Sequence, residues 1–174
     1  MEAFERFRTI PVFQRLEDAD LRALAAYAHK KAFAPGDVII REGERGDAFY
    51  FIDRGRVLVS RRFDHDVVPL VELIEGDFFG ESSLIGFESA PAMATVEARE
   101  TTVTWVITRE AITAWELENP MGVIRFFRIL STILSEKLRS LDDAYVRFFL
   151  EQQGDERISE LRALQEKLYR EWGL

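Results

Sequence analysis

The chain of 174 residues contains no cysteine. Disulfides, iron–sulfur clusters and zinc sites built from thiolates are therefore excluded. The sequence also lacks any run of about 18 uncharged apolar residues, and its first ten residues carry two glutamates in place of the apolar core of a signal peptide. These absences predict a soluble cytoplasmic protein with no membrane contact.

Positive charge and histidine are also scarce. The chain has 23 lysines and arginines against 31 acidic residues, which gives a formal net charge of −8. Such a surface repels phosphate backbones, so we expect no nucleic-acid partner. The two histidines are His29 and His65, and the triplet Asp64-His65-Asp66 fits a metal-binding turn or, more commonly, a solvated hairpin turn. We predict no bound metal and no cofactor.

Catalytic groups are not evident, because no nucleophile is paired with a base. Ser82 and Ser83 follow Glu81, but serines beside an acid at the start of a helix commonly cap that helix. We expect the protein not to be an enzyme.

Apolar residues make up 47% of the chain and aromatic residues 12%, enough for one compact unit with an appendage. Residues 16–29 begin with acids and continue with helically spaced apolar residues, which predicts a short helix capped by Asp18. From residue 31 to 108, glycine-containing turns separate runs rich in β-branched and aromatic residues. The expected strands are residues 38–40, 49–52, 57–59, 67–74 and 102–107. Strands at this density indicate a barrel or a double-sheet sandwich.

After residue 108 the apolar spacing becomes helical again. Residues 109–117 form one expected helix, and Asn119 and Pro120 suit the cap and first turn of a second, which runs to about residue 152. This second helix would be about 50 Å long. Its apolar stripe consists of Phe127, Leu130, Leu134, Leu138, Leu141, Tyr145 and Phe148.

A stripe of this length is more than a small barrel can cover. We therefore prefer a homodimer through this helix, with folding back onto the barrel as the alternative. Gly154 ends the helix, and residues 158–172 predict a last short helix that either caps the long one or docks on a partner protein. The predicted domains are residues 1–30 (N-terminal helical segment), 31–108 (β-barrel), 109–152 (hinge helix and long dimerisation helix) and 153–174 (short C-terminal helix).

Three linked motifs carry a family resemblance. Residues 43–47 read GERGD, residues 49–52 read FYFI and residues 76–81 read GDFFGE. In this order, together with the phrase IPVF at residues 10–13 and the long helix, the sequence resembles the cyclic-nucleotide-binding domain family over residues 8–150. Within that family it is most similar to the sensor half of the catabolite-activator and fumarate-nitrate-reduction regulators.

The resemblance implies an α+β, mainly β fold: an antiparallel jelly-roll barrel, or double-stranded β-helix, with N-terminal helices and a long C-terminal helix. Regulators of this kind usually continue into a helix-turn-helix module that reads the major groove. Only 20 residues follow Gly154. We therefore expect no DNA-reading module, and signal output through the dimer or through a protein partner.

The resemblance also implies a phosphate-binding cassette, a short helix whose N-terminus meets the cyclic phosphate. Residues 80–85 (the cassette) fit this role physically, because Gly80 allows close backbone approach and the next amides begin a helix that favours an anion. In the family the acid matching Glu81 accepts hydrogen bonds from a ribose 2′-hydroxyl; the alternative is an acid that only stabilises the helix dipole. The predicted ligand-binding residues are Phe79, Gly80, Glu81, Ser82, Ser83, Ala92 and Met93.

The sequence departs from the family at Ala92, which stands where the family's phosphate-pairing arginine lies. A guanidinium makes charge-assisted hydrogen bonds worth about 1.5 to 3 kcal/mol each, so its loss would weaken binding roughly tenfold to several hundredfold. Arg61, Arg62 and Arg99 are candidate replacements, although solvated turn charges are the commoner interpretation. Ala92 and Met93 would instead make an apolar wall.

Two functions remain open. In the first, a stand-alone regulatory sensor domain binds a small ligand at the cassette, a cyclic nucleotide by default, and shifts the dimer helix between two arrangements. In the second, the pocket is degenerate and the domain is a dimeric scaffold or a protein-interaction module. Because the arginine is absent, we expect weakened affinity for cyclic AMP and cyclic GMP.

Overall fold

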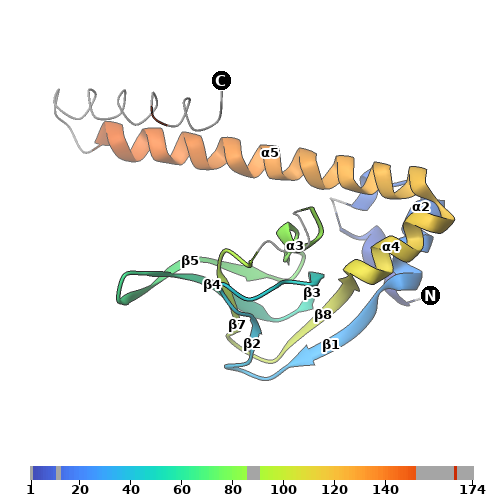
Figure 1. Cartoon of the computed structure of the whole chain (residues 1–174), viewed down its shortest axis with the longest axis horizontal. Coiled ribbons are helices and arrows are strands. Elements are labelled where there is room, and N and C mark those ends of the chain that lie inside the picture. Colours follow the sequence, from blue (N-terminus) through green and yellow to red (C-terminus); the bar gives the residue numbers. More distant parts are fainter. Residues whose placement is uncertain (1, 11–12, 86–90, 152–166, 168–174) are drawn as a thin grey trace. The chain divides into compact units, whose positions relative to one another are not determined.

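The computed structural model of the chain describes residues 2–10, 13–85, 91–151 and 167 (Figure 1). The chain divides into two compact units, Met1–Ser131 and Thr132–Leu174. The first unit holds the strands, the shorter helices and the first part of the long helix α5 (Pro120–Glu151). The rest of α5 belongs to the second unit.

The strands form two four-stranded antiparallel sheets. In the first sheet the order is β1 (His29–Phe33), β8 (Thr102–Thr108), β3 (Ala48–Arg54) and β6 (Phe78–Phe79). In the second sheet the order is β2 (Val38–Ile40), β7 (Thr95–Ala98), β4 (Arg56–Phe63) and β5 (Asp66–Ile74). This architecture confirms the mainly β, antiparallel fold, and each of the five predicted strands lies within an observed one.

A shared core joins the two sheets. It contains Phe33, Ala48, Tyr50, Ile52, Phe79 and Val106 of the first sheet and Val57, Val96 and Ala98 of the second. The intervening β3 residues are buried by other partners: Phe51 lies 6.0 Å from Phe7 between ring centroids, and Phe49 lies 6.2 Å from Phe126. Because both faces of β3 are covered, its sequence is a continuous apolar run instead of an alternating one.

The N-terminal helices are α1 (Glu2–Arg8), η1 (Phe13–Arg15) and α2 (Asp18–Tyr27). The prediction that Asp18 caps the helix over residues 16–29 is wrong. Glu17 takes the cap position without a side-chain hydrogen bond, and Asp18 is already helical. His29 belongs to β1, a strand that sequence analysis missed because four of its five residues are exposed and two are lysines.

The helices after the barrel agree with the sequence. α4 (Arg109–Glu118) covers the predicted residues 109–117, and α5 begins at Pro120. Asn119 caps α5, since its side-chain oxygen accepts a hydrogen bond from the amide of Gly122 at 2.9 Å. The predicted long helix is confirmed. The predicted helix over residues 158–172 lies, apart from Lys167, outside the described residues.

α2, α4 and the start of α5 meet around a buried carboxylate, at what we call the α2–α4–α5 corner (Asp20, Trp115, Asn119, Gly122 and Arg125). Asp20 is 1% exposed and accepts hydrogen bonds from Arg125 Nε at 2.5 Å and Nη2 at 2.9 Å, and from Asn119 Nδ2 at 3.2 Å. A Cβ on Gly122 would lie 2.8 Å from this carboxylate, so a larger residue does not fit without movement. The Arg125 hydrogen bond lowers the pKa of Asp20, which keeps the carboxylate ionised.

The apolar stripe of α5 becomes more exposed along the helix. Leu130 is fully buried, Phe127 and Leu134 are half-buried, and Leu138 and Leu141 are 54% and 66% exposed. The side chain of Tyr145 lies outside the described part of the chain. A membrane-crossing helix, which would have to be both long and apolar, is not found among the described residues.

Candidate functional site

Gly80 opens the cassette in a backbone conformation that favours glycine. Its φ is +81°, and a Cβ there would lie 2.5 Å from the carbonyl oxygen of Ala48, with Tyr50 and Ile40 atoms at 3.2 and 3.4 Å. A side chain at this position would therefore collide with β3 and also carry the strain of a positive φ. The structure thus explains the glycine by its contact with β3, and the predicted approach of a ligand to the Gly80 backbone remains a prediction.

α3 (Ser82–Ile85) follows Glu81, which confirms the predicted short helix. Leu84 is buried, and its amide donates to the Glu81 carbonyl oxygen at 3.0 Å. Ser82 is exposed and Glu81 is half-buried, while the side chain of Ser83 lies outside the described part. The roles of these side chains toward a ligand remain predictions.

The segment after the cassette is fastened to the GERGD loop. The amide of Gly43 donates to the Ala92 carbonyl oxygen, and the Ala92 amide donates to the Glu44 carbonyl oxygen, both at 2.8 Å. Arg45 pairs with Pro91 in an isolated antiparallel bridge. The GERGD loop and residues 91–92 are therefore held side by side.

The apolar wall predicted at Ala92 and Met93 is only half present. Ala92 is buried, as the prediction requires. Met93 is 69% exposed, so it does not close the core, and its role toward a ligand remains a prediction. Its thioether faces solvent and leaves Ala92 as the apolar member of the wall.

The candidate replacement cations lie on the surface. Arg61, Arg62 and Arg99 are all exposed. Arg61 Nε lies 3.7 Å from a Glu42 oxygen, and Arg99 Nη1 lies 3.4 Å from a Glu97 oxygen. Exposed ion pairs of this kind are worth about 0 to 1 kcal/mol, so these arginines fit the interpretation as solvated charges.

A pocket of about 70 Å³ borders the cassette. It is lined by Ile39, Ile40, Arg41, Glu44, Arg45, Gly46, Asp47, Ala48 and Tyr50. Three of these residues, Ile40, Ala48 and Tyr50, are also the nearest neighbours of Gly80. The pocket and the cassette therefore share a wall.

Tyr50 provides the aromatic part of this pocket. Its ring stacks on Phe79 with centroids 4.9 Å apart and planes 5° apart. Burial, and to a smaller extent the charge of Asp47, raises the pKa of Tyr50, so the phenol is neutral near pH 7 and its hydroxyl can donate a hydrogen bond. Phe79, a predicted ligand residue, does not line the pocket itself but packs against Tyr50, which does.

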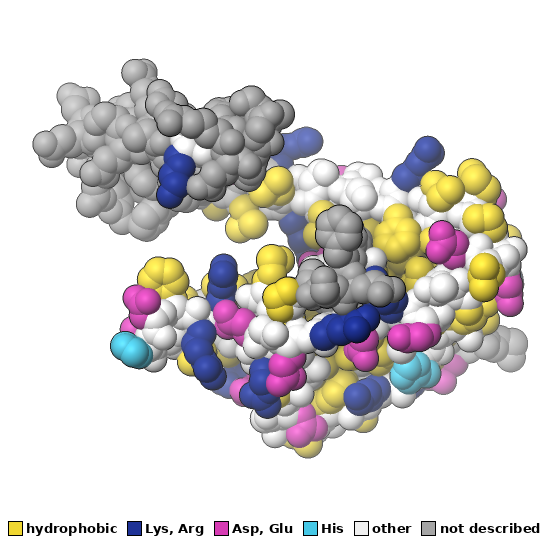
Figure 2. All heavy atoms as spheres, viewed as in Figure 1, with side chains coloured by type: hydrophobic (Ala, Val, Ile, Leu, Met, Phe, Trp, Pro, Cys, Tyr) yellow, Lys and Arg dark blue, Asp and Glu magenta, His cyan; other side chains and the backbone are white. Residues whose placement is uncertain are grey.

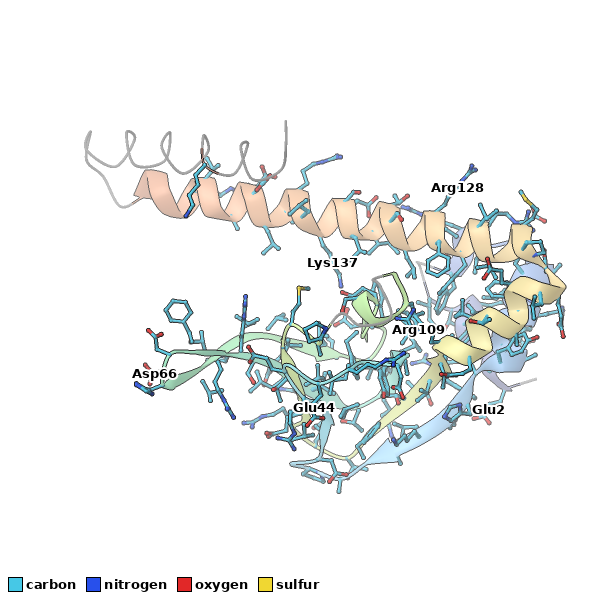
Figure 3. The ribbon with its side chains drawn as sticks, viewed as in Figure 1. Glu2, Glu44, Asp66, Arg109, Arg128 and Lys137 are labelled. Atoms are coloured by element: carbon cyan, nitrogen blue, oxygen red, sulfur yellow. The ribbon has the colours of Figure 1, made fainter. Side chains whose placement is uncertain are left out.

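Two arginines line the pocket and differ in their pairing. Arg41 Nε lies 3.3 Å from an oxygen of Glu44, a residue labelled in Figure 3. Arg45 forms no ion pair with any residue that the structure describes. Sequence reasoning missed Arg45 because it used the GERGD motif only for recognition, and the two acids of that motif, Glu44 and Asp47, give no sign in the sequence that Arg45 lacks an ion pair.

Arg109 adds a second unsatisfied nitrogen next to the pocket (Figure 3). Its amide donates to the carbonyl oxygen of the pocket residue Asp47 at 2.8 Å. Its Nε is buried and has no hydrogen-bond partner in the described part of the chain. Trp105 and Trp115 also carry buried ring nitrogens without a partner among the described residues, so it is the bond to Asp47 that places the start of α4 beside the pocket.

The exposed apolar surface of the β4–β5 hairpin is a further feature that sequence reasoning missed. Its exposed apolar residues are Phe63, Val67, Val68, Leu70, Val71 and Ile74, with exposed fractions between 42% and 72%. Figure 2 shows yellow apolar side chains at the free end of this hairpin. Exposed apolar groups that gather on one element commonly mark a binding surface.

Metal chemistry finds no support among the described residues. They contain no group of three or more histidine, cysteine, aspartate or glutamate side chains that could hold an ion. His65 lies in the tight turn between β4 and β5, where Asp64 has a φ of 52°. This position matches the predicted solvated hairpin turn.

The sequence profile of the cyclic nucleotide-binding domain matches residues 30–115. This part of the chain belongs to the cyclic nucleotide-binding domain family. The match spans the barrel, the GERGD loop, the cassette and most of α4. The family is regulatory and generally non-catalytic.

Known relatives support this assignment to the cyclic nucleotide-binding domain family. The chain is 34% identical over 91 residues to a cGMP-dependent protein kinase of Caenorhabditis elegans, a match that covers 51% of this chain and 12% of the kinase. The chain therefore spans a small part of that relative. The catabolite activator protein of Thermus thermophilus is 25% identical with a TM-score of 0.66, over 80% of this chain and 63% of that one.

A cyclic nucleotide-binding domain from Methylobacillus flagellatus supports the fold alone. It has a TM-score of 0.71 at 22% identity and covers 88% of this chain, with 84% of its own length matched. The resemblance inferred from the sequence and the jelly-roll fold that it implied are both confirmed.

Proposed function

We propose that this chain is a regulatory sensor domain that binds a small phosphate-bearing ligand, with a cyclic mononucleotide as the first candidate. The observation that carries the proposal is the close contact between Gly80 and the wall of a pocket that contains Arg45 and Tyr50. Membership of the family supports the class of ligand. A relative named as a cGMP-dependent kinase supports it further.

The charged end of the ligand and its base would occupy different parts of the barrel. A pocket of about 70 Å³ is smaller than the roughly 300 to 1,000 Å³ of sites that enclose drug-sized ligands. It accepts a phosphate group and not a whole nucleotide. On the hairpin, Leu73 packs against the core, and Val71, on the same face, is 48% exposed. This inner face provides an apolar surface for the base.

Ala92 sets the expected affinity. The buried methyl group offers no charge where the family has an arginine. We therefore expect the ligand to bind more weakly than it would with a guanidinium at this position, by roughly tenfold or more.

Ligand-dependent stabilisation tests the proposal directly. A ligand that binds only the folded chain raises its stability by about 2.7 kcal/mol at 100 times the dissociation constant. Thermal unfolding should therefore shift upward with cyclic AMP, cyclic GMP or a cyclic dinucleotide. No shift with any of them at millimolar concentration would contradict a nucleotide ligand.

Glu81 gives the same experiment a specific control. If its carboxylate accepts a hydrogen bond from the ribose, 2′-deoxy cyclic AMP should bind the parent chain more weakly than cyclic AMP. Glu81→Gln should reduce that difference. Equal binding of both nucleotides would leave Glu81 with the helix-dipole role only.

We infer that output passes through a dimer formed by α5. Leu138 and Leu141 are exposed within the second unit, at the three-residue spacing of a helix–helix seam. Sedimentation should show a dimer that Leu141→Glu dissociates. Ser140→Glu is the control: it adds the same charge at the exposed residue before Leu141 and should leave the dimer intact. A parent chain that sediments as a monomer would contradict this inference.

A dimeric scaffold or protein-interaction module with a degenerate pocket is the second candidate. The absence of charge at Ala92 and the exposed apolar hairpin favour it, because a partner protein would cover such a hairpin. Ala92→Arg separates the two functions. Nucleotide binding that appears only in this variant would favour the degenerate pocket, whereas binding by the parent favours the sensor.

A further inference from the structure

We propose that Arg45 supplies the positive charge that holds the phosphate group of the ligand, from the GERGD loop instead of from position 92. This inference rests on the proposed function and names the residue that makes the main charged contact at the pocket. It also predicts which of the two pocket arginines a ligand needs.

The backbone places Arg45 beside the position where the charge is missing. Arg45 is bridged to Pro91, and the carbonyl oxygen of the preceding Glu44 accepts the Ala92 amide at 2.8 Å. Opposed residues of an antiparallel pair have Cβ atoms about 4.5 to 5.5 Å apart. An arginine side chain is longer than this separation. Its guanidinium can therefore reach past Pro91, the residue before Ala92, into the pocket that Arg45 lines.

Arg45 also differs from its neighbour in charge pairing. Arg41 is already engaged with Glu44 at 3.3 Å, so a ligand would have to compete with that carboxylate. Arg45 is exposed like Arg61, Arg62 and Arg99, but it lines the pocket and has no ion pair among the described residues, so its guanidinium is available for a planar, two-oxygen contact with a phosphate.

The acids that line the pocket with Arg45 are Glu44, which pairs with Arg41, and Asp47, while Glu110 is a further acid within electrostatic reach. Glu110 lies exposed in the first turn of α4, and its pKa is lowered first by its own backbone amide and then by the Thr108 hydroxyl, with a smaller contribution from Arg45. Arg45 is thus within electrostatic reach of Glu110 but not paired with it. A phosphate in the pocket would be a stronger partner, because it offers several oxygens in a partly enclosed site.

The pocket has room for this group. A void of about 70 Å³ holds a few water molecules, and a phosphate can displace them. Tyr50 lines the opposite side with a neutral phenol, whose hydroxyl is a further donor for an oxygen of the ligand.

The test compares Arg45→Gln with Arg41→Gln in the full chain. Both variants remove one positive charge from the same pocket, so a general loss of charge affects them equally. Calorimetric titration with cyclic AMP and cyclic GMP should show binding weakened about tenfold or more in Arg45→Gln, and less than about threefold in Arg41→Gln. Arg45→Lys should fall between, because an ammonium lacks the planar fork.

A rescue variant makes the test sharper. Adding Ala92→Arg to Arg45→Gln should restore binding at least to the level of the parent chain, since either guanidinium can hold the same phosphate. Circular dichroism checks that each variant is folded. Unchanged binding in Arg45→Gln overturns the proposal, and so does a failed rescue in a folded double variant. In both cases the proposed function still holds as long as the parent chain binds a nucleotide.

Inorganic phosphate separates this inference from the proposed function. If the parent chain binds no cyclic nucleotide, the proposed ligand is wrong, and phosphate alone then decides the role of Arg45. Thermal stabilisation by phosphate that is lost in Arg45→Gln and kept in Arg41→Gln supports the charge assignment. No stabilisation, or equal stabilisation of both variants, overturns it.

Discussion

The α2–α4–α5 corner and the cassette side of the barrel differ in how their charged groups are paired, although Trp115 Nε1 at the corner is buried without a partner among the described residues. At the corner, the Asp20 carboxylate accepts three hydrogen bonds, and Gly122 leaves no space for a further atom. Beside the cassette, the described residues provide no ion pair for Arg45 and no acceptor for Arg109 Nε. The β4–β5 hairpin adds exposed apolar side chains to this second region.

This difference indicates that the corner is a structural support and that the cassette side of the barrel is a binding surface. A buried carboxylate whose charge is paired fixes one geometry, because any movement would leave that charge without a partner. Charged and apolar groups that stay unpaired in the folded chain instead suit a ligand or a partner. We therefore expect substitutions at the corner to act mainly on stability, and substitutions beside the cassette to act mainly on binding.

Arg125→Ala should have the largest effect. It leaves Asp20, 1% exposed, as an unpaired carboxylate, and removal of one partner of a buried pair commonly costs about 3 kcal/mol or more. The free energy of unfolding, measured by urea denaturation at pH 7, should fall by about 3 kcal/mol. Ligand affinity measured in the folded state should change little.

Asp20→Ala provides the matched control at the other end of the pair. Its cost should be smaller, because Arg125 has 36% of its side chain exposed and can turn into solvent. The opposite order, with Asp20→Ala more destabilising than Arg125→Ala, would show that the corner is held by the acid through Asn119 and not by the ion pair.

Gly80→Ala tests the cassette as a steric feature. The new Cβ would lie 2.5 Å from the Ala48 carbonyl oxygen at a φ of +81°. We expect a loss of about 2 to 3 kcal/mol in unfolding free energy, from the left-handed strain and the collision together, and a loss of ligand binding. Differential scanning calorimetry and nucleotide titration measure the two effects.

Gly76→Ala is the control that measures the cost of a positive φ without a steric collision. Gly76 has a φ of +94°, but nothing lies within 4 Å of its Cβ position. It should therefore cost only about 1 to 2 kcal/mol and leave the cassette in place. If Gly80→Ala and Gly76→Ala destabilise the chain equally, β3 must shift to accept the new Cβ at residue 80. The contact between Gly80 and β3 would then not fix the position of the cassette.

Much of the fold was readable from the sequence because local signals agreed with packing. Glycine turns and β-branched runs located five strands, and Asn119 with Pro120 marked the start of α5. β1 was missed because its exposed lysines join the sheet through pairing with β8, a contact that local composition does not encode. The same limit explains Asp18: an acid early in a helix pattern can be a cap or a first-turn residue.

The candidate site was predicted less completely than the fold. Gly80 and α3 were found because glycine and helix-start signals are local. Arg45 and Arg109 were not, since their importance depends on which carboxylates lie near them in space. The exposure of Met93 could not be predicted for the same reason: it follows from the path of the chain between Ala92 and β7, which the residue type does not determine.

The pH dependence of the corner should show a smaller effect. The hydrogen bond from Arg125 lowers the pKa of Asp20 below its ordinary value of 3.8. The ionised Asp20 therefore contributes fully to the free energy of unfolding above pH 3.8. This contribution is lost as the pH falls through the lower pKa that Asp20 has in the folded chain. In Arg125→Ala, burial without a partner raises the pKa of Asp20.

Urea denaturation at pH 7, 5 and 3.5 should show that the difference between the parent chain and Arg125→Ala narrows as the pH falls. Both chains lose the charge of Asp20 at low pH, although the variant loses it first. A difference that stays constant over this range would mean that Arg125 stabilises the corner by packing alone.

Val71→Thr should have the smallest effect on stability. It still tests whether the cassette side of the barrel, unlike the α2–α4–α5 corner, responds to substitution in ligand binding. Val71 lies opposite Val59, is 48% exposed and has the same shape as threonine. The unfolding free energy should change by less than about 0.5 kcal/mol. If the inner face of the hairpin contacts the base, nucleotide affinity should still fall, by roughly fivefold, because the added hydroxyl loses its water.

Val67→Thr is the matched change on the other face of the same hairpin, since Val67 lies opposite Arg62. It introduces the same hydroxyl and should leave nucleotide affinity unchanged. A loss of affinity confined to Val71→Thr would assign the inner face to the ligand. If both variants bind as the parent does, the apolar hairpin does not serve the nucleotide, and its exposed side chains then favour a protein partner, as the scaffold function requires.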